Sequence, residues 1–211
     1  MNSDVLVIDY GVGNHQSVEN ALKFLGAKYK VSGKIEDIKQ ARAFIFPGVG
    51  AFAEAAHNLS RRGIEPILRD QVLVKKKPLL GICLGMQLLA EDSQENGFHQ
   101  GLGWIKGHVV KLNSNREFKI PHVGWNSLNI KILTPLFNQL SPDPTFYFDH
   151  SYHFSAEPHL IAATAWHGTE VIAAIQKQHI FGVQFHPEKS QRNGLKFLRA
   201  FLNFINHYSY A

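Results

Sequence analysis

Short apolar runs alternate with amphipathic stretches through the first hundred residues, and this alternation restricts the fold more than any other feature. Residues 5–8, 43–46 and 78–82 are short, mostly apolar runs, typical of strands buried on both faces of a parallel sheet. Residues 18–25 repeat apolar side chains at helical spacing, which predicts a helix that ends at Gly26. The full expectation for this half is strands at 5–8, 29–31, 43–46 and 78–82 and helices at 18–25, 35–41, 51–59 and 64–75. Such alternation predicts an α/β fold, a mostly parallel sheet with helices on both faces.

The pattern changes after Gly103, where short β-rich segments are broken by Gly, Pro and Asn. We expect these segments to be antiparallel strands and loops that extend the sheet. They cover 104–112, 127–133, 146–154, 161–166, 171–176 and 180–185, and a last amphipathic helix begins near Gln191. No repeat, low-complexity tract or linker divides the chain, so residues 1–211 are expected to form a single domain.

Composition excludes several classes of protein. Hydrophobic residues make up 45% of the chain, which excludes intrinsic disorder, and no apolar run approaches the roughly 20 residues of a membrane helix. The formal net charge is +5, but the basic residues are dispersed, and their densest run, 75–77, closes a predicted helix. Nucleic acid and membrane are therefore not expected partners. One cysteine and a start without signal-peptide features predict a cytoplasmic protein.

The single cysteine lies in a G-x-C-x-G arrangement, residues 81–85, where a predicted strand meets a predicted helix. This is the cysteine counterpart of the nucleophile elbow of hydrolases. Small flanking residues allow the sharp turn, and the helix N-terminus favours the thiolate form of Cys83. The alternative is that Cys83 is a buried small hydrophobic residue, as most lone cysteines are. The two glycines at this spacing favour the nucleophile.

A general base is expected at His186, which follows the predicted strand 180–185 and precedes Pro187 and Glu188. In an extended chain, residues i and i+2 project to the same side, so Glu188 can accept a ring N–H and orient the imidazole. Together with Cys83, these residues form a candidate nucleophile–base–orienter triad. The alternative is a strand end with an incidental ion pair.

Two further patterns are less specific. Gly48, Val49 and Gly50 follow a predicted strand, and their backbone N–H groups could form an oxyanion hole, although a simple turn explains them as well. His150 and His153 are three apart along a predicted strand and so face opposite sides, which argues against a metal site. No metal or other cofactor is expected.

These residues together resemble the class I (triad-type) glutamine amidotransferases, and within that class the glutaminase subunits of imidazole glycerol phosphate synthase. The resemblance covers nearly the whole chain and is carried by residues 9–14, 47–52, 81–89, 101–103, 121–126, 147–152 and 184–190. The elbow and the His-Pro-Glu segment are common to the class. The segments at 9–14 and 121–126 (Pro-His-Val-Gly-Trp-Asn) point to the subfamily.

The resemblance implies hydrolysis of L-glutamine to glutamate and ammonia through a thioester on Cys83, with His186 as acid and base and Glu188 as its orienter. It implies an oxyanion hole formed by the N–H of Leu84 and the strand 48–50. It also implies two sets of binding residues. Glutamine would contact Gln87, Glu95, Ser151 and Tyr152, and the partner interface would include Asn14, Trp125, Asn126 and Lys189.

Ammonia chemistry predicts a partner independently of the resemblance. Free ammonia is mostly protonated at neutral pH, so it must pass to an acceptor along a protected path, and the amidase fold is expected to occupy this whole chain. The resemblance implies a heterodimer with a (β/α)8 cyclase of histidine synthesis. The alternative is a paralogous subunit that supplies a sugar amidotransferase in surface-polysaccharide synthesis. A catalytically silent binding subunit and a peptidase on the same scaffold are the remaining hypotheses.

Overall fold

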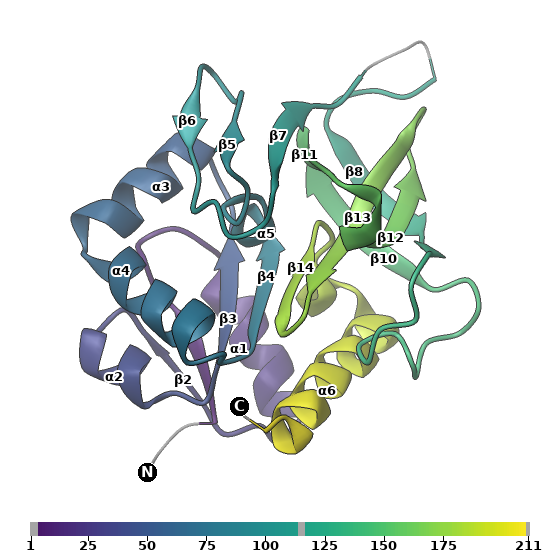
Figure 1. Ribbon diagram of the computed structural model, residues 1–211. Helices are drawn as coiled ribbons and strands as arrows, with labels where there is room; N and C mark the ends of the chain where they lie inside the picture. Colours follow the sequence, from purple (N-terminus) through teal and green to yellow (C-terminus); the bar gives the residue numbers. More distant parts are fainter. Residues whose placement is uncertain (1–3, 114–116, 210–211) are drawn as a thin grey trace.

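A central sheet of eight strands runs through the computed structural model, which describes residues 4–113 and 117–209 (Figure 1). In spatial order its strands are β2 (Tyr29–Ser32), β1 (Val5–Ile8), β3 (Ala43–Gly48), β4 (Leu79–Cys83), β14 (Ile180–Val183), β13 (Glu170–Lys177), β12 (Ile161–Trp166) and β9 (Asn129–Ile130). The first five are mutually parallel, and the last three continue the sheet with antiparallel pairing. The predicted parallel core with an antiparallel extension is confirmed.

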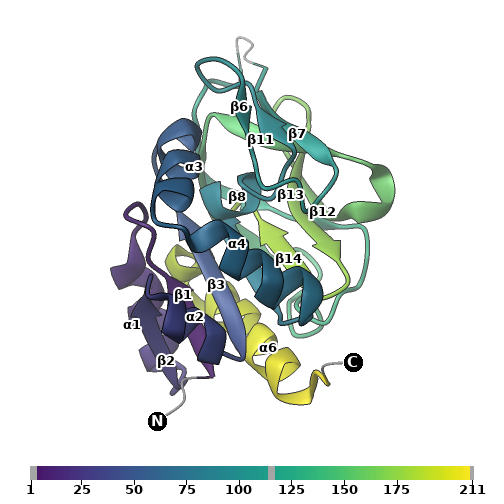
Figure 2. The same cartoon turned by 60° about the vertical axis from the view of Figure 1, so that its left-hand side comes forward.

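Helices cover both faces of the parallel part, as Figure 2 shows from the side. They are α1 (His15–Phe24), α2 (Ile35–Gln40), α3 (Phe52–Arg61), α4 (Ile64–Arg69), α5 (Leu84–Gln87) and α6 (Gln191–His207). Alternate side chains of β1 enter two separate cores: Val5 and Val7 pack with α1 and α6, whereas Leu6 and Ile8 pack with α2, α3 and α4. Burial on both faces explains why this strand is apolar throughout.

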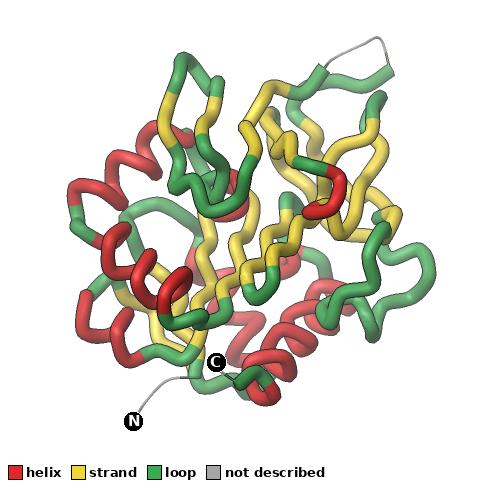
Figure 3. Tube along the Cα trace, in the orientation of Figure 1, coloured by secondary structure: helices red, strands yellow, loops and turns green. Residues whose placement is uncertain are grey.

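The β-rich second half differs from the expectation in one respect. Only part of it extends the central sheet, because two smaller sheets form beside it. One is a ribbon of β8 (His122–Ser127) with β10 (Thr145–His150), and the other joins β11 (Tyr152–Ala156), β7 (Gly107–Lys111), β5 (Asp92–Ser93) and β6 (His99–Gln100). Figure 3 shows these strands beside the central sheet; β6 contacts α3, and β10 contacts α6. A β-rich pattern indicates a strand but does not select its pairing partner.

Several predicted boundaries were wrong. The expected strand 146–154 breaks at Ser151 into β10 and β11, which belong to different sheets. Of the segment 127–133, Ser127 ends β8 and Asn129–Ile130 form β9. The rest of β8 was not predicted because glycine and polar residues interrupt it. The helix expected over 64–75 is α-helical to Arg69 and then a π-helix over Asp70–Val74. Two 3-10 turns, Pro158–Leu160 and Pro187–Lys189, complete the elements, and among the described residues no helix has the length and hydropathy to cross a membrane.

The carboxyl ends of β3, β4 and β14 meet at one edge of the sheet, which is where ligand sites of open α/β sheets occur. Gly48 of β3 lies opposite Cys83 of β4 in the register, and β14 pairs with β4 up to Val183. The residues that follow β14, including His186, therefore continue toward the end of β4. The fold brings the predicted nucleophile and base to the same edge.

Candidate active site

Cys83 ends β4 and begins α5 on a strained turn. Its backbone φ is 54° and ψ is −112°, a conformation that non-glycine residues rarely adopt and that persists only where packing enforces it. The packing comes from the neighbouring glycines: a Cβ on Gly85 would overlap the carbonyl oxygen of Phe46, and one on Gly81 would lie 2.8 Å from the oxygen of Gly85. The close approach of the backbones leaves no space for larger residues. This packing holds Cys83 in the strained turn, with 7% of the residue exposed.

His186 and Glu188 form a buried pair beside the thiol. Nδ1 of His186 lies 2.7 Å from Oε1 of Glu188, and the two side chains are only 2% and 3% exposed. Burial alone would lower the pKa of His186, but the charges of Cys83 and Glu188 outweigh it and raise that pKa to about 10. Nε2 of His186 is buried and has no hydrogen-bond partner among the described residues. The ring can therefore hold a proton at neutral pH and offer it from Nε2.

A cavity of about 310 Å³ opens in front of the thiol, a size at the lower end of small-molecule pockets. It collects residues that lie far apart in the sequence. Its walls include the predicted residues Val49, Gly50, Cys83, Leu84, Gln87, Glu95, Ser151, Tyr152 and His186. Gly48 and Glu188 do not line it directly. The structure thus brings the candidate nucleophile, base and binding residues around one space.

The strand end 48–50 forms one wall of this cavity. Gly48 is tightly enclosed, since a Cβ there would lie 2.6 Å from the Tyr10 hydroxyl oxygen. That hydroxyl donates to the carbonyl of Pro47 at 2.9 Å, and burial raises the pKa of Tyr10 far above its usual range, so it remains a neutral donor. Gly50 has φ +105° with open space around it. The wall is anchored at Gly48 and unconstrained by packing at Gly50.

The predicted glutamine-binding residues already hold defined partners. Oε2 of Glu95 accepts from the backbone N–H of Phe52 at 2.7 Å, at the start of α3. Nε2 of Gln87 donates to the carbonyl of Tyr152 at 2.8 Å and to Oε1 of Gln184 at 3.0 Å. These bonds fix the directions of the carboxylate and amide that face the cavity.

Sequence reasoning missed two residues next to the triad. Gln184 is completely buried, and its Nε2 donates to Sγ of Cys83 at 3.6 Å. The hydroxyl of Ser190 donates to the carbonyl of His186 at 2.6 Å and accepts from the N–H of Tyr147 at 2.9 Å. A buried glutamine at the end of an apolar strand was the available signal for Gln184. No local pattern distinguished Ser190.

The predicted partner residues divide between two environments. Trp125 is 49% exposed and contacts the Tyr147 ring edge-on, and the ammonium of Lys189 lies 5.6 Å from the centre of the same ring. Asn14 is exposed at the start of α1, where its side chain accepts from the N–H of Ser17. Asn126 differs, because its side-chain amide is directed at His122 and at the carbonyl of Trp166.

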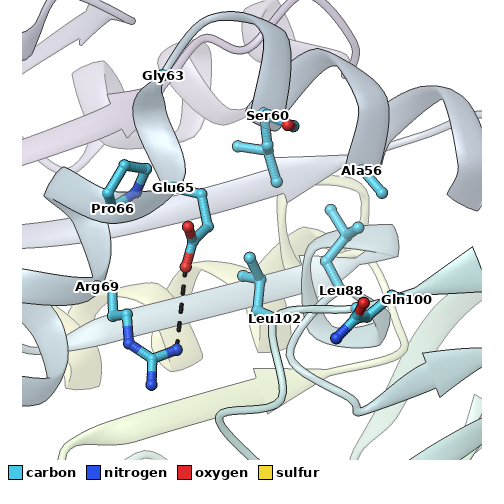
Figure 4. Close-up of a pocket in the computed structure, with 11 residues that line it drawn as sticks. Ala56, Ser60, Gly63, Glu65, Pro66, Arg69, Leu88, Gln100 and Leu102 are labelled. Carbon is cyan, nitrogen blue, oxygen red and sulfur yellow. Dashed lines mark ion pairs between the residues drawn. The ribbon is translucent and has the colours of Figure 1, made fainter.

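A larger hollow of about 570 Å³ lies between α3, α4 and the loop that carries Leu102 (Figure 4). Apolar side chains such as Leu88 and Leu102 and polar ones such as Gln100 line it together, and Glu65 and Arg69 form an ion pair there at 4.0 Å. The described residues that line it include none of the predicted triad, oxyanion-hole or glutamine-binding residues. The described part of the chain also contains no group of three His, Cys, Asp or Glu side chains arranged to hold a metal ion.

Comparisons with known proteins assign the chain to a family. Residues 6–204 match the family model of glutamine amidotransferase class-I. The chain is 45% identical over 202 residues to imidazole glycerol phosphate synthase subunit HisH 2 of Vibrio vulnificus, covering 95% of this chain and 94% of the relative. It is 46% identical over 197 residues to the HisH subunit of Listeria monocytogenes, covering 93% and 94%.

Solved structures agree with the fold. A glutamine amidotransferase superposes with a TM-score of 0.75 at 21% identity, covering 95% of this chain and 98% of that one. PurLQS of Thermotoga maritima gives a TM-score of 0.73 at 20% identity, with coverage of 97% and 100%. The chain belongs to the class-I glutamine amidotransferases and, within them, to the family of HisH subunits.

Proposed function

We propose that this chain is the glutaminase subunit of an imidazole glycerol phosphate synthase in histidine biosynthesis. The observation that carries the proposal is the strained Cys83 elbow beside the His186–Glu188 pair, with Cys83 and His186 lining one cavity of about 310 Å³. The relatives at 45–46% identity bear the name of that synthase's HisH subunit. The reaction converts L-glutamine and water to glutamate and ammonia.

In the first half-reaction, the Cys83 thiolate attacks the side-chain carbonyl carbon of glutamine and forms a C–S bond. The carbonyl oxygen becomes an oxyanion, for which the N–H of Leu84 and those of the strand 48–50 are the candidate donors. Collapse of this intermediate breaks the C–N bond. The imidazolium of His186 delivers its Nε2 proton to the leaving nitrogen, so ammonia departs and a γ-glutamyl thioester remains.

In the second half-reaction, neutral His186 removes a proton from water, and the resulting hydroxide attacks the thioester carbon. The C–S bond breaks, which restores the thiolate beside the imidazolium and releases the product, whose new γ-carboxyl group gives its proton to solvent to form glutamate. Glu188 keeps Nδ1 protonated through both steps because its carboxylate accepts that N–H at 2.7 Å. Its role is to fix the tautomer and the ring plane.

Glutamine recognition is proposed for Gln87, Glu95, Ser151 and Tyr152. The carboxylate of Glu95 is the charged group suited to the substrate ammonium, and its bond to the N–H of Phe52 holds it in place. The Gln87 amide and the loop after β10 line the same cavity as this carboxylate and the thiol. Recognition of both ends would align the reacting carbonyl with Sγ.

The ammonia acceptor is proposed to be a separate cyclase barrel that docks on the exposed outer face of the β8/β10 ribbon, defined by Val123, Trp125, Tyr147 and Asp149, with Lys189 at its edge. Val123 and Trp125 are 52% and 49% exposed, more than is usual for apolar side chains of this size. The reaction is placed in the cytoplasm, where the single Cys83 thiol stays reduced.

Glutamate release by purified wild type, Cys83→Ala and Gln191→Ala tests the proposal. Gln191 is exposed at the start of α6 and serves as the control substitution. Each is assayed alone, with the cyclase and its ribonucleotide ligand, and with a sugar amidotransferase of the same source. Stimulation by the cyclase in wild type and Gln191→Ala, but not in Cys83→Ala, is the expected result. Stimulation only by the sugar enzyme would contradict the assigned pathway, and full activity of Cys83→Ala would contradict the chemistry.

A further inference from the structure

The inner face of the β8/β10 ribbon carries an unbroken chain of hydrogen bonds. His122 and His150 lie directly opposite each other in the register of the two strands, and Nδ1 of the first is 2.9 Å from Nε2 of the second. Nδ1 of His150 lies 2.9 Å from the carbonyl oxygen of Tyr152. That oxygen also accepts from Nε2 of Gln87. The chain continues through Gln184 to Sγ of Cys83.

The other end of the chain is the side-chain amide of Asn126. Its Nδ2 lies 3.1 Å from Nε2 of His122 and 2.8 Å from the carbonyl oxygen of Trp166, while its Oδ1 accepts from the N–H of Ser127 at 2.9 Å. The two hydrogens of this amide therefore have two acceptors, and the assignment of oxygen and nitrogen follows from the partners.

Only one set of tautomers satisfies every link. Because Asn126 donates, Nε2 of His122 must accept, so its proton is on Nδ1 and is donated to Nε2 of His150. His150 then carries its own proton on Nδ1, where a carbonyl oxygen requires a donor. A second proton on either ring would place two donors face to face. Both imidazoles are therefore neutral in this arrangement.

Packing holds the rings in these orientations. The His122 ring is stacked between Phe148, at 4.6 Å and 19°, and His167, at 4.1 Å and 22°. His167 has an independent partner, since its Nε2 lies 2.8 Å from the carbonyl oxygen of Lys119. Burial lowers the pKa of His122 to about 4 and that of His150 to about 3, which agrees with neutral rings at pH 7.

We propose that His122 and His150 are positioning residues. Through this hydrogen-bond chain, in which each ring has one tautomer, they couple the position of strands β8 and β10 to the geometry of the glutamine site. The outer face of the same strands carries Val123, Trp125 and Asp149, since side chains alternate across a strand. A partner that docks on that face displaces the backbone of β8 and β10, which carries the two histidines. The chain converts this movement into the placement of the Gln87 amide and of the Gln184 amide that contacts the thiol. The proposal rests on the proposed glutaminase function.

Replacement of Asn126 by Asp tests the chain without adding or removing bulk. A carboxylate accepts only, so Nε2 of His122 must become a donor. If both rings stay neutral, two acceptors then face each other further along the chain; otherwise one ring takes a second proton and with it a charge that the wild-type chain does not carry. The matched control is Asn129→Asp, the same change at an exposed position of β9 outside the chain. We expect kcat/KM for glutamine to fall about tenfold or more in Asn126→Asp, since small displacements of reacting groups have effects of this size, and to stay within about twofold in the control. Equal values in the two variants would overturn the proposal.

Two further measurements do not depend on turnover and use the intact chain. Nitrogen-15 spectra of the imidazoles should show Nδ1–H for His122 and His150 and Nε2–H for His167, with signals assigned through His122→Asn and His150→Asn. Iodoacetamide alkylation of Cys83, with and without glutamine, should change in Asn126→Asp and not in Asn129→Asp. An Nε2–H tautomer at either ribbon histidine, or unchanged alkylation in Asn126→Asp, would overturn the chain. These outcomes are separate from failure of the proposed function, in which wild type would release no glutamate with any partner.

Discussion

Two walls of the same cavity are held by different physical means. On the parallel-sheet side, Cys83 is fixed by contact: the backbones around Gly85 and Phe46 approach so closely that only glycine fits. On the ribbon side, His150 and Tyr152 are fixed by directional hydrogen bonds between groups that must carry particular protons. Close packing of backbones does not depend on pH and is disrupted only when a larger side chain is introduced. A hydrogen-bond chain, in contrast, responds to the gain or loss of a single proton or to a small movement of one strand. The nucleophile therefore sits on the rigid wall, and the adjustable wall is the one proposed to face a partner.

The largest expected effect tests the rigid wall. Gly85→Ala adds a methyl group where the carbonyl oxygen of Phe46 lies, so a strand or the elbow must move. We expect the free energy of unfolding to fall by more than about 4 kcal/mol, with loss of glutaminase activity. Urea unfolding followed by circular dichroism measures the change. Gly103→Ala is the control: φ is +64° but no atom lies within 4 Å, so only about 1–2 kcal/mol of backbone strain is expected. Similar losses in both variants would show that contact does not fix the elbow.

Lowering the pH tests the side of the cavity formed by the β8/β10 ribbon. Because burial lowers the pKa of His122 to about 4 and of His150 to about 3, the unfolded chain takes up protons near pH 6.5 before the folded chain does. Their contribution to stability is complete above about pH 6.5 and is lost as the pH falls, by up to about 1.4 kcal/mol per pH unit for each histidine. Urea unfolding between pH 7 and pH 5 should therefore show a smaller loss in His150→Asn than in wild type. His57→Asn, at an exposed position of α3, should show the same dependence of the free energy of unfolding on pH as wild type. If the free energy of unfolding of His150→Asn fell with pH as steeply as that of wild type, the prediction would be contradicted.

Ser190 joins the two walls, because its hydroxyl bridges the carbonyl of His186 and the N–H of Tyr147. Ser190→Ala leaves that partly buried N–H without its acceptor, and we expect a loss of about 1–3 kcal/mol in the free energy of unfolding. Glutamate release should fall as well, since His186 loses a support of its backbone. Ser190→Thr keeps the hydroxyl and should retain more activity than Ser190→Ala. The opposite order would show that the bridge does not matter.

The smallest effect on stability is expected on the outer face of the ribbon. Trp125 is 49% exposed, so Trp125→Ala should change the free energy of unfolding by under about 1 kcal/mol. Partner-stimulated glutamate release should nevertheless fall about tenfold, since large aromatic side chains dominate interface energies. Phe24→Ala removes a 73% exposed ring from the end of α1 and should leave that stimulation unchanged. Equal stimulation of both variants by the cyclase would place the docking face elsewhere.

The sequence determined the features that depend on residues close together along the chain. Apolar runs and helical spacing predict the parallel core, because a strand buried on both faces must be apolar at every position. The spacing of Gly81, Cys83 and Gly85 predicts the elbow, and the two-residue spacing of His186 and Glu188 predicts their contact, since such residues face the same side. These geometries follow from local backbone rules and need no knowledge of the remaining chain.

Only the tertiary structure decided which distant residues meet. The pairing of His122 with His150 depends on the register of β8 with β10, and the contact of Gln184 with Cys83 depends on β14 lying beside β4. The division of the second half into three sheets likewise depends on which strand edges find each other. Alternating side chains mark a strand but do not identify its neighbour, so the links of Gln87 to Tyr152 and to Gln184, and of Gln184 to the thiol, arise from long-range packing.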